Sequence, residues 1–135
     1  LAPFDEFAFD DVRYTALPVT HAPGTYGYLM EGPSGRRTFY ASDTGALPPE
    51  TAERVRGADA LIMDATFWGR NWSPGAHHSV QETIEEGLAL GAGTIYLTHL
   101  AMHYDTPITL AELEARLEPY DGRVRCAADG LTILL

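Results

Sequence analysis

The sequence predicts an α/β fold in which a mixed sheet carries three helices on one face. In the second half of the chain, apolar strand-like runs alternate with amphipathic helical segments, a pattern typical of an α/β layer. The first half instead holds successive segments rich in aromatic and β-branched residues, which favour antiparallel strands. Nothing in the sequence indicates what covers the other face of this sheet.

The first half is predicted to contain three strands, over residues 11–20, 26–31 and 36–42. The second and third are separated by Gly32-Pro33-Ser34-Gly35, residues that form turns. Residues 26–42 are therefore expected to form a β-hairpin.

Two capping boxes, each a Ser or Thr followed three residues later by Glu, mark helix starts in the second half. They are formed by Ser79 with Glu82 and by Thr109 with Glu112. The remaining elements are expected in this order: a helix over 48–56, a buried strand over 59–64, a helix after Ser79 that Gly91 ends, a buried strand over 94–98, a helix after Thr109 that Pro119 ends, and closing strands over 124–127 and 131–135.

Length and composition fit one globular domain of 135 residues, with 45% apolar and 21% charged residues. The net charge of −10 argues against nucleic acid and anionic membrane as partners. Cys126 is the one cysteine, which excludes a disulfide framework and a thiolate metal cluster. No apolar run reaches the length of a membrane span, and the start lacks the basic region of a signal peptide. We therefore expect a cytoplasmic protein.

Three side chains that can bind metals follow predicted strands: His21, Asp43 and His99. The carboxyl ends of strands in α/β sheets are where polar side chains converge in a crevice. Two imidazoles and a carboxylate are ligands that zinc, manganese and non-haem iron accept. From the residues alone, a solvent-facing histidine and a turn role for Asp43 remain the alternatives.

Four further polar residues are candidates for the same site. His77 and His78 precede a predicted helix, where a histidine can face a crevice and donate a proton; an exposed loop pair is the alternative. Asp64 ends a strand and is a candidate for orienting a metal ligand. His103 is a candidate pocket residue, although it follows a strand and so lacks the helical spacing of a paired metal site.

Taken together, the order and spacing of five stretches resemble the C-terminal half of the metallo-β-lactamase superfamily. The resemblance is to its phosphodiesterase branch, which includes ribonuclease Z and the cyclic-phosphate diesterase of the carbon–phosphorus lyase pathway. The stretches are residues 21–29 (HAPGTYGYL), 42–45 (SDTG), 58–66 (ADALIMDAT), 77–79 (HHS) and 97–100 (LTHL).

The resemblance implies a four-layer αβ/βα sandwich with two divalent metal ions, zinc or manganese, at the sheet edges. His21 would bind the first ion, Asp43 would bridge both, and His99 would complete the second. The ions would lower the pKa of a bridging water and hold the substrate phosphate. Asp43 and His77 are the implied catalytic residues, with His77 contacting the phosphate and protonating the leaving group.

One departure from the family pattern is large. The His-x-His-x-Asp-His motif, which supplies four further ligands, is absent from residues 1–135. We therefore interpret the chain as a single partial domain without the N-terminal half of the sandwich, and we expect it to be inactive alone.

The implied function is hydrolysis of small phosphodiesters, because the acidic composition disfavours transfer RNA. Another hydrolase of the superfamily, such as a lactonase or a thioesterase, is an alternative. A non-catalytic fragment or interaction domain is a second alternative, which retention of His21, Asp43, His77 and His99 in one chain weighs against. A homodimer is suggested only by analogy with the family.

Overall fold

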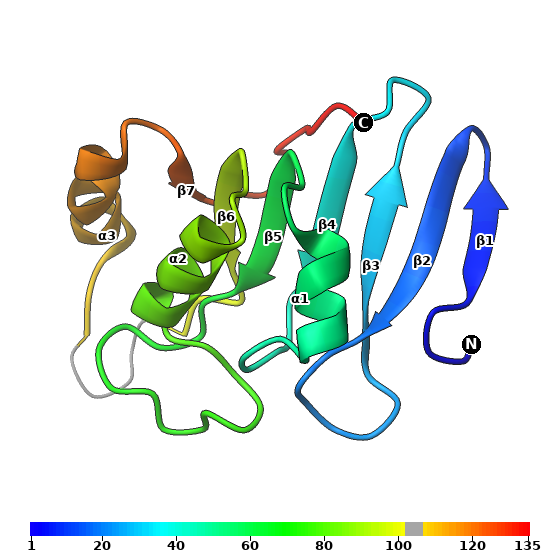
Figure 1. Cartoon of the computed structure of the whole chain (residues 1–135). Coiled ribbons are helices and arrows are strands. Elements are labelled where there is room, and N and C mark those ends of the chain that lie inside the picture. The colour runs from blue at the N-terminus through cyan, green and yellow to red at the C-terminus, as the bar shows by residue number, and fades with distance from the viewer. Residues whose placement is uncertain (102–106) are drawn as a thin grey trace.

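The computed structural model describes residues 1–101 and 107–135. Its seven strands form one sheet in the order β1-β2-β3-β4-β5-β6-β7 (Figure 1). The elements are β1 (Glu6–Phe9), β2 (Val12–Pro18), β3 (Tyr26–Glu31), β4 (Arg37–Ala41), α1 (Pro49–Val55), β5 (Ala60–Asp64), α2 (Val80–Ala89), β6 (Thr94–Thr98), α3 (Leu110–Leu117), the 3-10 turn η1 (Glu118–Tyr120) and β7 (Val124–Cys126).

The sheet is mixed, as the sequence predicts. β1 to β4 pair antiparallel, and β4 to β7 pair parallel. Because β4, β5 and β6 run in the same direction, their carboxyl ends lie at one edge of the sheet. This edge holds Asp43, Asp64 and His99, which follow or end these three strands.

The helices begin where the sequence places them. Both capping boxes form: the Ser79 and Thr109 hydroxyls each accept a hydrogen bond from the backbone N–H of the glutamate three residues on, which reaches back to the capping residue. The longest helix, α2, has 10 residues, so none of the helices in the described ranges is long and apolar enough to cross a membrane. Gly87 lets α2 approach β6, because a Cβ there would lie 2.6 Å from Ile95 Cδ1.

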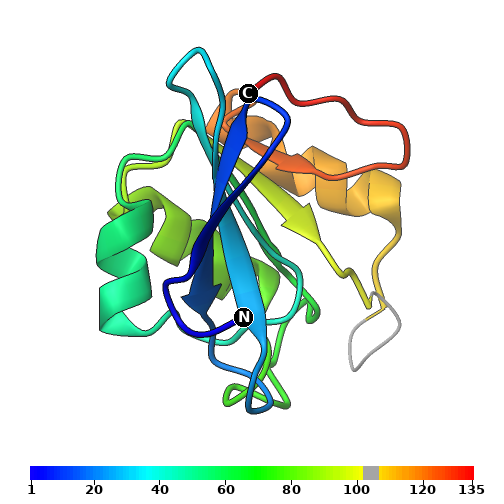
Figure 2. The same cartoon turned by 90° about the vertical axis from the view of Figure 1, so that its right-hand side faces the viewer.

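All three helices pack on the sheet through one buried cluster. Val55 of α1, Ile84 of α2 and Leu113 of α3 belong to this cluster together with Leu61 and Leu97 of the central strands. Figure 2 shows α1 and α2 on the same side of the sheet, with α3 next to the β7 end. The prediction of a mixed sheet with three helices is therefore confirmed.

The opposite face of the sheet carries a row of three tyrosines and one isoleucine. Tyr28, Tyr40, Ile62 and Tyr96 are successive register partners across β3, β4, β5 and β6. Their neighbours along each strand point into the helical core, so these four side chains face the other way. This is the face for which the sequence indicates no cover, and Tyr40 is 42% exposed on it.

Two strand predictions are wrong. Residues 6–9 form β1, a strand that the sequence analysis does not predict. This strand pairs with β2 through backbone hydrogen bonds. All four of its residues are exposed, so its sequence shows no alternation of buried apolar and exposed polar residues. Residues 131–135 do not form the expected closing strand. A turn at Gly130, with φ of 84°, redirects the chain, and Leu135 packs against Gly32 in the turn between β3 and β4.

Candidate metal centre

Four of the predicted site residues converge at the carboxyl edge of the parallel strands. Asp43 follows β4, Asp64 ends β5, His99 follows β6, and His77 comes from the loop between β5 and α2. Each offers one ligand atom, and these four atoms lie within 4.8 Å of one another. Such a cluster of imidazole and carboxylate groups has the composition that divalent transition metals bind.

Asp64 is the buried member of this cluster. Its carboxylate is fully buried, and its Oδ1 accepts hydrogen bonds from the backbone N–H of Thr66 (2.8 Å) and from the Thr66 hydroxyl (2.6 Å). Its Oδ2 accepts from the backbone N–H of Thr44 (3.0 Å) and lies 2.7 Å from His77 Nδ1. With both oxygens engaged by protein donors, Asp64 is suited to orient the histidines beside it.

The hydrogen bonds around Asp64 fix which ring nitrogen each histidine presents. The Thr66 hydroxyl has one proton, which it donates to Asp64, so it accepts from His99 Nδ1 at 2.7 Å. His77 Nδ1 carries a proton because it faces the Asp64 carboxylate. The two rings are parallel, with centroids 5.4 Å apart and planes at 7°. Each Nε2 therefore lies on the ring edge away from Asp64, free to meet a ligand.

Asp43 and His99 form the open side of the cluster. His99 Nε2 lies 3.3 Å from Asp43 Oδ1, and the two side chains are 42% and 37% exposed. His99 Nε2 thus faces a carboxylate oxygen on the open side of the cluster, and a cation bound between the two groups would interact with both. His99 also has a φ of 57°, an uncommon conformation for a residue with a side chain, and such strain concentrates at functional sites.

His21 lies beside this cluster. Its ring is 5.1 Å from the His77 ring, centroid to centroid, at an interplanar angle of 74°. Its Nδ1 is buried and has no hydrogen-bond partner among the described residues. A buried imidazole nitrogen without a partner is unfavourable, and a bound ion nearby would supply one. His21 is not one of the four residues whose ligand atoms lie within 4.8 Å of one another, and its unpartnered Nδ1 is the observation that makes it a candidate for a bound ion.

His78 takes no part in the four-residue cluster. His78 is 4% exposed, and its Nε2 lies 3.5 Å from Glu86 Oε2. Burial raises the pKa of Glu86, against the opposing influence of His78. The adjacent histidines therefore differ: His77 joins the candidate metal site, and His78 contacts α2. His103 lies outside the described residues.

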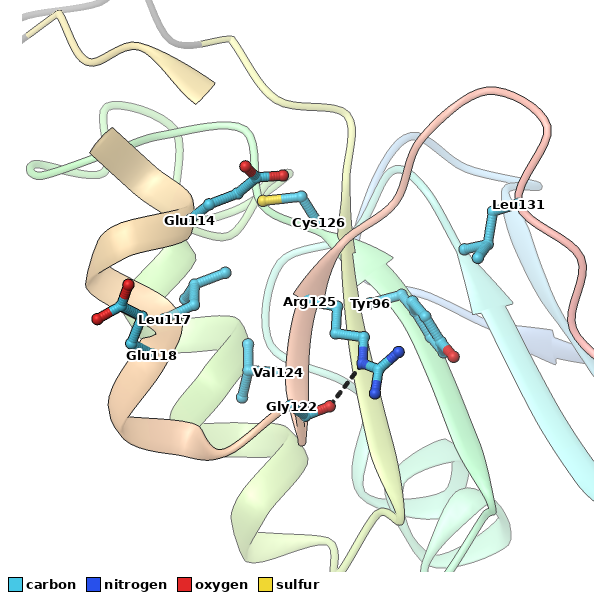
Figure 3. Close-up of a pocket in the computed structure, with 9 residues that line it drawn as sticks. All are labelled: Tyr96, Glu114, Leu117, Glu118, Gly122, Val124, Arg125, Cys126 and Leu131. Carbon is cyan, nitrogen blue, oxygen red and sulfur yellow. Dashed lines mark hydrogen bonds between the residues drawn. The ribbon is translucent and has the colours of Figure 1, made fainter. Parts of the chain in front are cut away.

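A second pocket on the surface is larger than the one beside His77 but has no histidine in its lining. A pocket of about 420 Å³ lies between α3, β7 and the C-terminal segment, larger than the pocket of about 310 Å³ beside His77 (Figure 3). Its polar lining consists of Tyr96, Glu114, Glu118, Arg125 and Cys126, without a histidine. The histidine–aspartate cluster lies at the strand ends instead.

Thr66 is the site residue that the sequence interpretation missed. Its hydroxyl lies within hydrogen-bond distance of Asp64 Oδ1 and His99 Nδ1, and its backbone N–H also binds Asp64. The signal was present in the Asp-x-Thr spacing after a buried strand, because a carboxylate readily accepts a hydrogen bond from the backbone two residues on.

Replacing Thr66 with valine tests this hydroxyl. Thr66→Val keeps the shape of the side chain but leaves Asp64 Oδ1 and His99 Nδ1 each with one partner fewer. Because groups that orient metal ligands typically contribute 10- to 100-fold to metal affinity, we expect a metal dissociation constant about 10- to 100-fold higher. Competition with a chromophoric chelator measures it. Thr66→Ser, which restores the hydroxyl, should bind metal nearly as the native protein does; equal weakening by both variants would contradict this role.

Fold and site together define an α/β protein with a histidine–aspartate cluster at the ends of parallel strands. The family model described as "Beta-lactamase superfamily domain" matches residues 1–100. The chain therefore belongs to the beta-lactamase superfamily, and the resemblance identified from its motifs is confirmed.

Curated relatives and solved structures agree with this assignment. Ribonuclease Z from Haloarcula marismortui is 36% identical over 101 residues, which cover 72% of this chain and 32% of that protein. The chain thus spans about a third of the length of this relative. A diphosphatase of the PhnP family superposes with a TM-score of 0.77 at 21% identity, covering 99% of this chain and 47% of its own. Zn²⁺-bound PqqB from Methylobacterium extorquens superposes with a TM-score of 0.71 at 19% identity, covering 100% and 51%. These structural likenesses show the fold.

Proposed function

We propose that this chain contributes one side of a dinuclear metal centre to a metal-dependent hydrolase of small phosphodiesters. The observation that carries the proposal is the convergence of Asp43, His77 and His99 around the buried Asp64. Metal chemistry needs imidazole and carboxylate groups that are held in place and open to solvent on one side, and this cluster has both properties.

His21, Asp43 and His99 are the residues that would hold the ions. Asp43 has two carboxylate oxygens and can serve two ions at once, while each histidine offers one nitrogen. Zinc or manganese would supply an activated water and stabilise charge on the phosphate. The four further ligands that the superfamily motif provides would come from residues outside these 135, so residues 1–135 form one partial domain of the active protein.

His77 would act on the leaving group. Its Nδ1 is held 2.7 Å from Asp64 Oδ2, which fixes the ring and stabilises a positive charge on it. Its Nε2 can then carry a proton toward the departing oxygen. A buried carboxylate behind an imidazole is an arrangement suited to general acid catalysis.

Two observations support a phosphodiester as the substrate. The curated relative above is named ribonuclease Z, and the structural relative is described as a diphosphatase, so both names point to phosphate chemistry. The net charge of −10 disfavours a long polyanion, since repulsion grows with the number of phosphates. A small phosphodiester meets both conditions.

Metal removal tests the proposal. The full-length protein that contains this chain should hold close to two divalent ions per chain by elemental analysis, and should hydrolyse a generic aryl phosphodiester. Dialysis against a chelator should abolish turnover, and adding zinc or manganese should restore it. Unchanged turnover in the metal-free protein would contradict the proposal, and metal binding without hydrolysis of any ester tested would favour a non-catalytic role.

A further inference from the structure

The side chain of one asparagine, Asn71, makes hydrogen bonds that hold the loop carrying His77. This segment, residues 68–78, is called the His77 loop below. Asn71 Nδ2 donates hydrogen bonds to the backbone carbonyl of His77 (2.8 Å) and to Glu82 Oε2 (2.6 Å). Asn71 Oδ1 accepts from the backbone N–H of Ser73 (2.9 Å). One side chain therefore joins the start of the loop, its end and the first turn of α2.

The contact with Glu82 links the loop to a rigid element. Glu82 Oε2 also accepts from the backbone N–H (2.7 Å) and hydroxyl (2.8 Å) of Ser79, as part of the capping box of α2. Partial burial raises the pKa of Glu82, but these hydrogen bonds and the one from Asn71 outweigh it and lower the pKa overall. The carboxylate that receives Asn71 thus stays ionised and accepts strong hydrogen bonds at neutral pH.

The other side of the His77 loop rests on the turn that carries Asp43. A Cβ on Gly45 would lie 2.5 Å from the Pro74 carbonyl oxygen and 3.5 Å from the Ala76 backbone nitrogen. Gly45 has no left-handed conformation in the structure, so this close approach is the reason a glycine is needed. Its backbone N–H donates to the Thr20 carbonyl (2.8 Å), next to His21.

From these contacts we infer that Asn71 is a positioning residue for His77, and that Gly45 allows the His77 loop to pack closely against the turn that carries Asp43. Asn71 holds the His77 backbone while Asp64 holds its ring, so the two together fix the direction of Nε2. Gly45 sets the distance between the loop and the Asp43 turn. The inference rests on the proposed function for its effect on turnover, but the geometry of the His77 ring can be measured without it.

The central variant is Asn71→Ala in the full-length protein. It removes all three hydrogen bonds but none of the candidate metal ligands. We expect kcat for an alkyl phosphodiester, whose leaving group needs a proton, to fall about 10-fold or more with KM and metal content unchanged, because small displacements of a catalytic group lower turnover steeply. Gln81→Ala is the matched control: it removes an exposed amide on α2 that bonds Glu85 (2.7 Å), and it should leave kcat unchanged.

A double-mutant cycle separates positioning from general stability. If Asn71 acts through His77, Asn71→Ala should cause no further loss in a His77→Ala background. An equal loss in both backgrounds, or native kcat in Asn71→Ala, would overturn the inference. Gly45→Ala is the second variant, expected to lower kcat in the same non-additive way by displacing Pro74.

A spectroscopic readout keeps the inference testable if no hydrolysis is found. In the metal-free protein, the ¹⁵N and ¹H ring signals of His77 should shift in Asn71→Ala and stay in place in Gln81→Ala. Unchanged His77 signals in Asn71→Ala would contradict positioning, whatever the reaction. Retained hydrolysis in Asp43→Ala would instead contradict the proposed function and leave this ring measurement as the deciding one.

Discussion

Asp43→Ala is expected to lower turnover at least about 10³-fold and to release bound metal. The bridging position proposed for Asp43 would serve both ions, so its loss should weaken the binding of both. Stabilisation of transition-state charge by metal contributes several kcal/mol, and each 1.36 kcal/mol corresponds to a tenfold change in rate. Elemental analysis and steady-state hydrolysis of an aryl phosphodiester, both in the full-length protein, measure the two effects.

The fold of the variant should be unharmed, which makes the result interpretable. The Asp43 side chain is 37% exposed and accepts one side-chain hydrogen bond, from the Ser42 hydroxyl at 2.9 Å. Truncating it leaves no buried group unpaired, so the thermal midpoint should stay near the native value in metal-free protein. Asp129→Ala, an exposed carboxylate near the C-terminus, is the matched control and should keep metal and turnover. Two ions per chain in Asp43→Ala would exclude a bridging role.

The contrast between Asp43 and Asp64 explains why equivalent positions on neighbouring strands have different roles. Both follow the same rule of placement at the carboxyl end of a parallel strand. Asp64 is fully buried and surrounded by four donors, whereas Asp43 is open and faces His99 Nε2. A buried carboxylate with hydrogen-bond donors on both oxygens, such as Asp64, orients its neighbours. An exposed carboxylate beside a histidine, such as Asp43, has oxygen lone pairs available to bind an ion.

Most residues of the candidate metal site could be predicted from the sequence, because the sequence pattern indicates where a buried strand ends. A buried apolar run followed by a polar residue places that residue at the sheet edge, and Asp43, Asp64 and His99 do lie together there. His21, predicted as a ligand with Asp43 and His99, lies next to His77 and is not one of the four clustered residues. Sequence spacing could not show that His77 joins the site while His78 contacts Glu86, because the conformation of the loop decides which ring faces the site. The contact of Thr66 with Asp64 has a local signal in the Asp-x-Thr spacing, but its contact with His99, 33 residues further on, leaves no local pattern.

The same reasoning explains the errors in the fold. A strand is recognised by alternation of buried and exposed side chains, and Glu6–Phe9 buries none of its residues. Conversely, residues 131–135 are apolar without being paired, because the turn at Gly130 carries them away from β7. Hydrophobicity alone reports neither hydrogen bonding to a neighbouring strand nor burial, because Leu131 and Leu134 are 46% and 74% exposed.

His77→Ala should lower kcat for an alkyl phosphodiester by about 10²- to 10⁴-fold, the usual contribution of a general acid, while leaving two ions bound. Metal content separates this role from the alternative that the four-residue cluster permits, in which His77 is itself a ligand. Because Asp64 Oδ2 lies 2.7 Å from Nδ1, the ring is oriented by the protein before any ion arrives. Removal of the ring should therefore leave metal binding to the proposed ligands His21, Asp43 and His99 intact.

The dependence on the leaving group gives the decisive comparison. A good leaving group such as a nitrophenolate departs without a proton, so His77→Ala should affect its release little, whereas an alkyl ester should lose the full factor. His78→Ala is the matched control, since it removes the neighbouring ring that contacts Glu86 at 3.5 Å and should not change this dependence. Equal losses for both esters would exclude proton donation by His77, and loss of one ion per chain would make His77 a metal ligand.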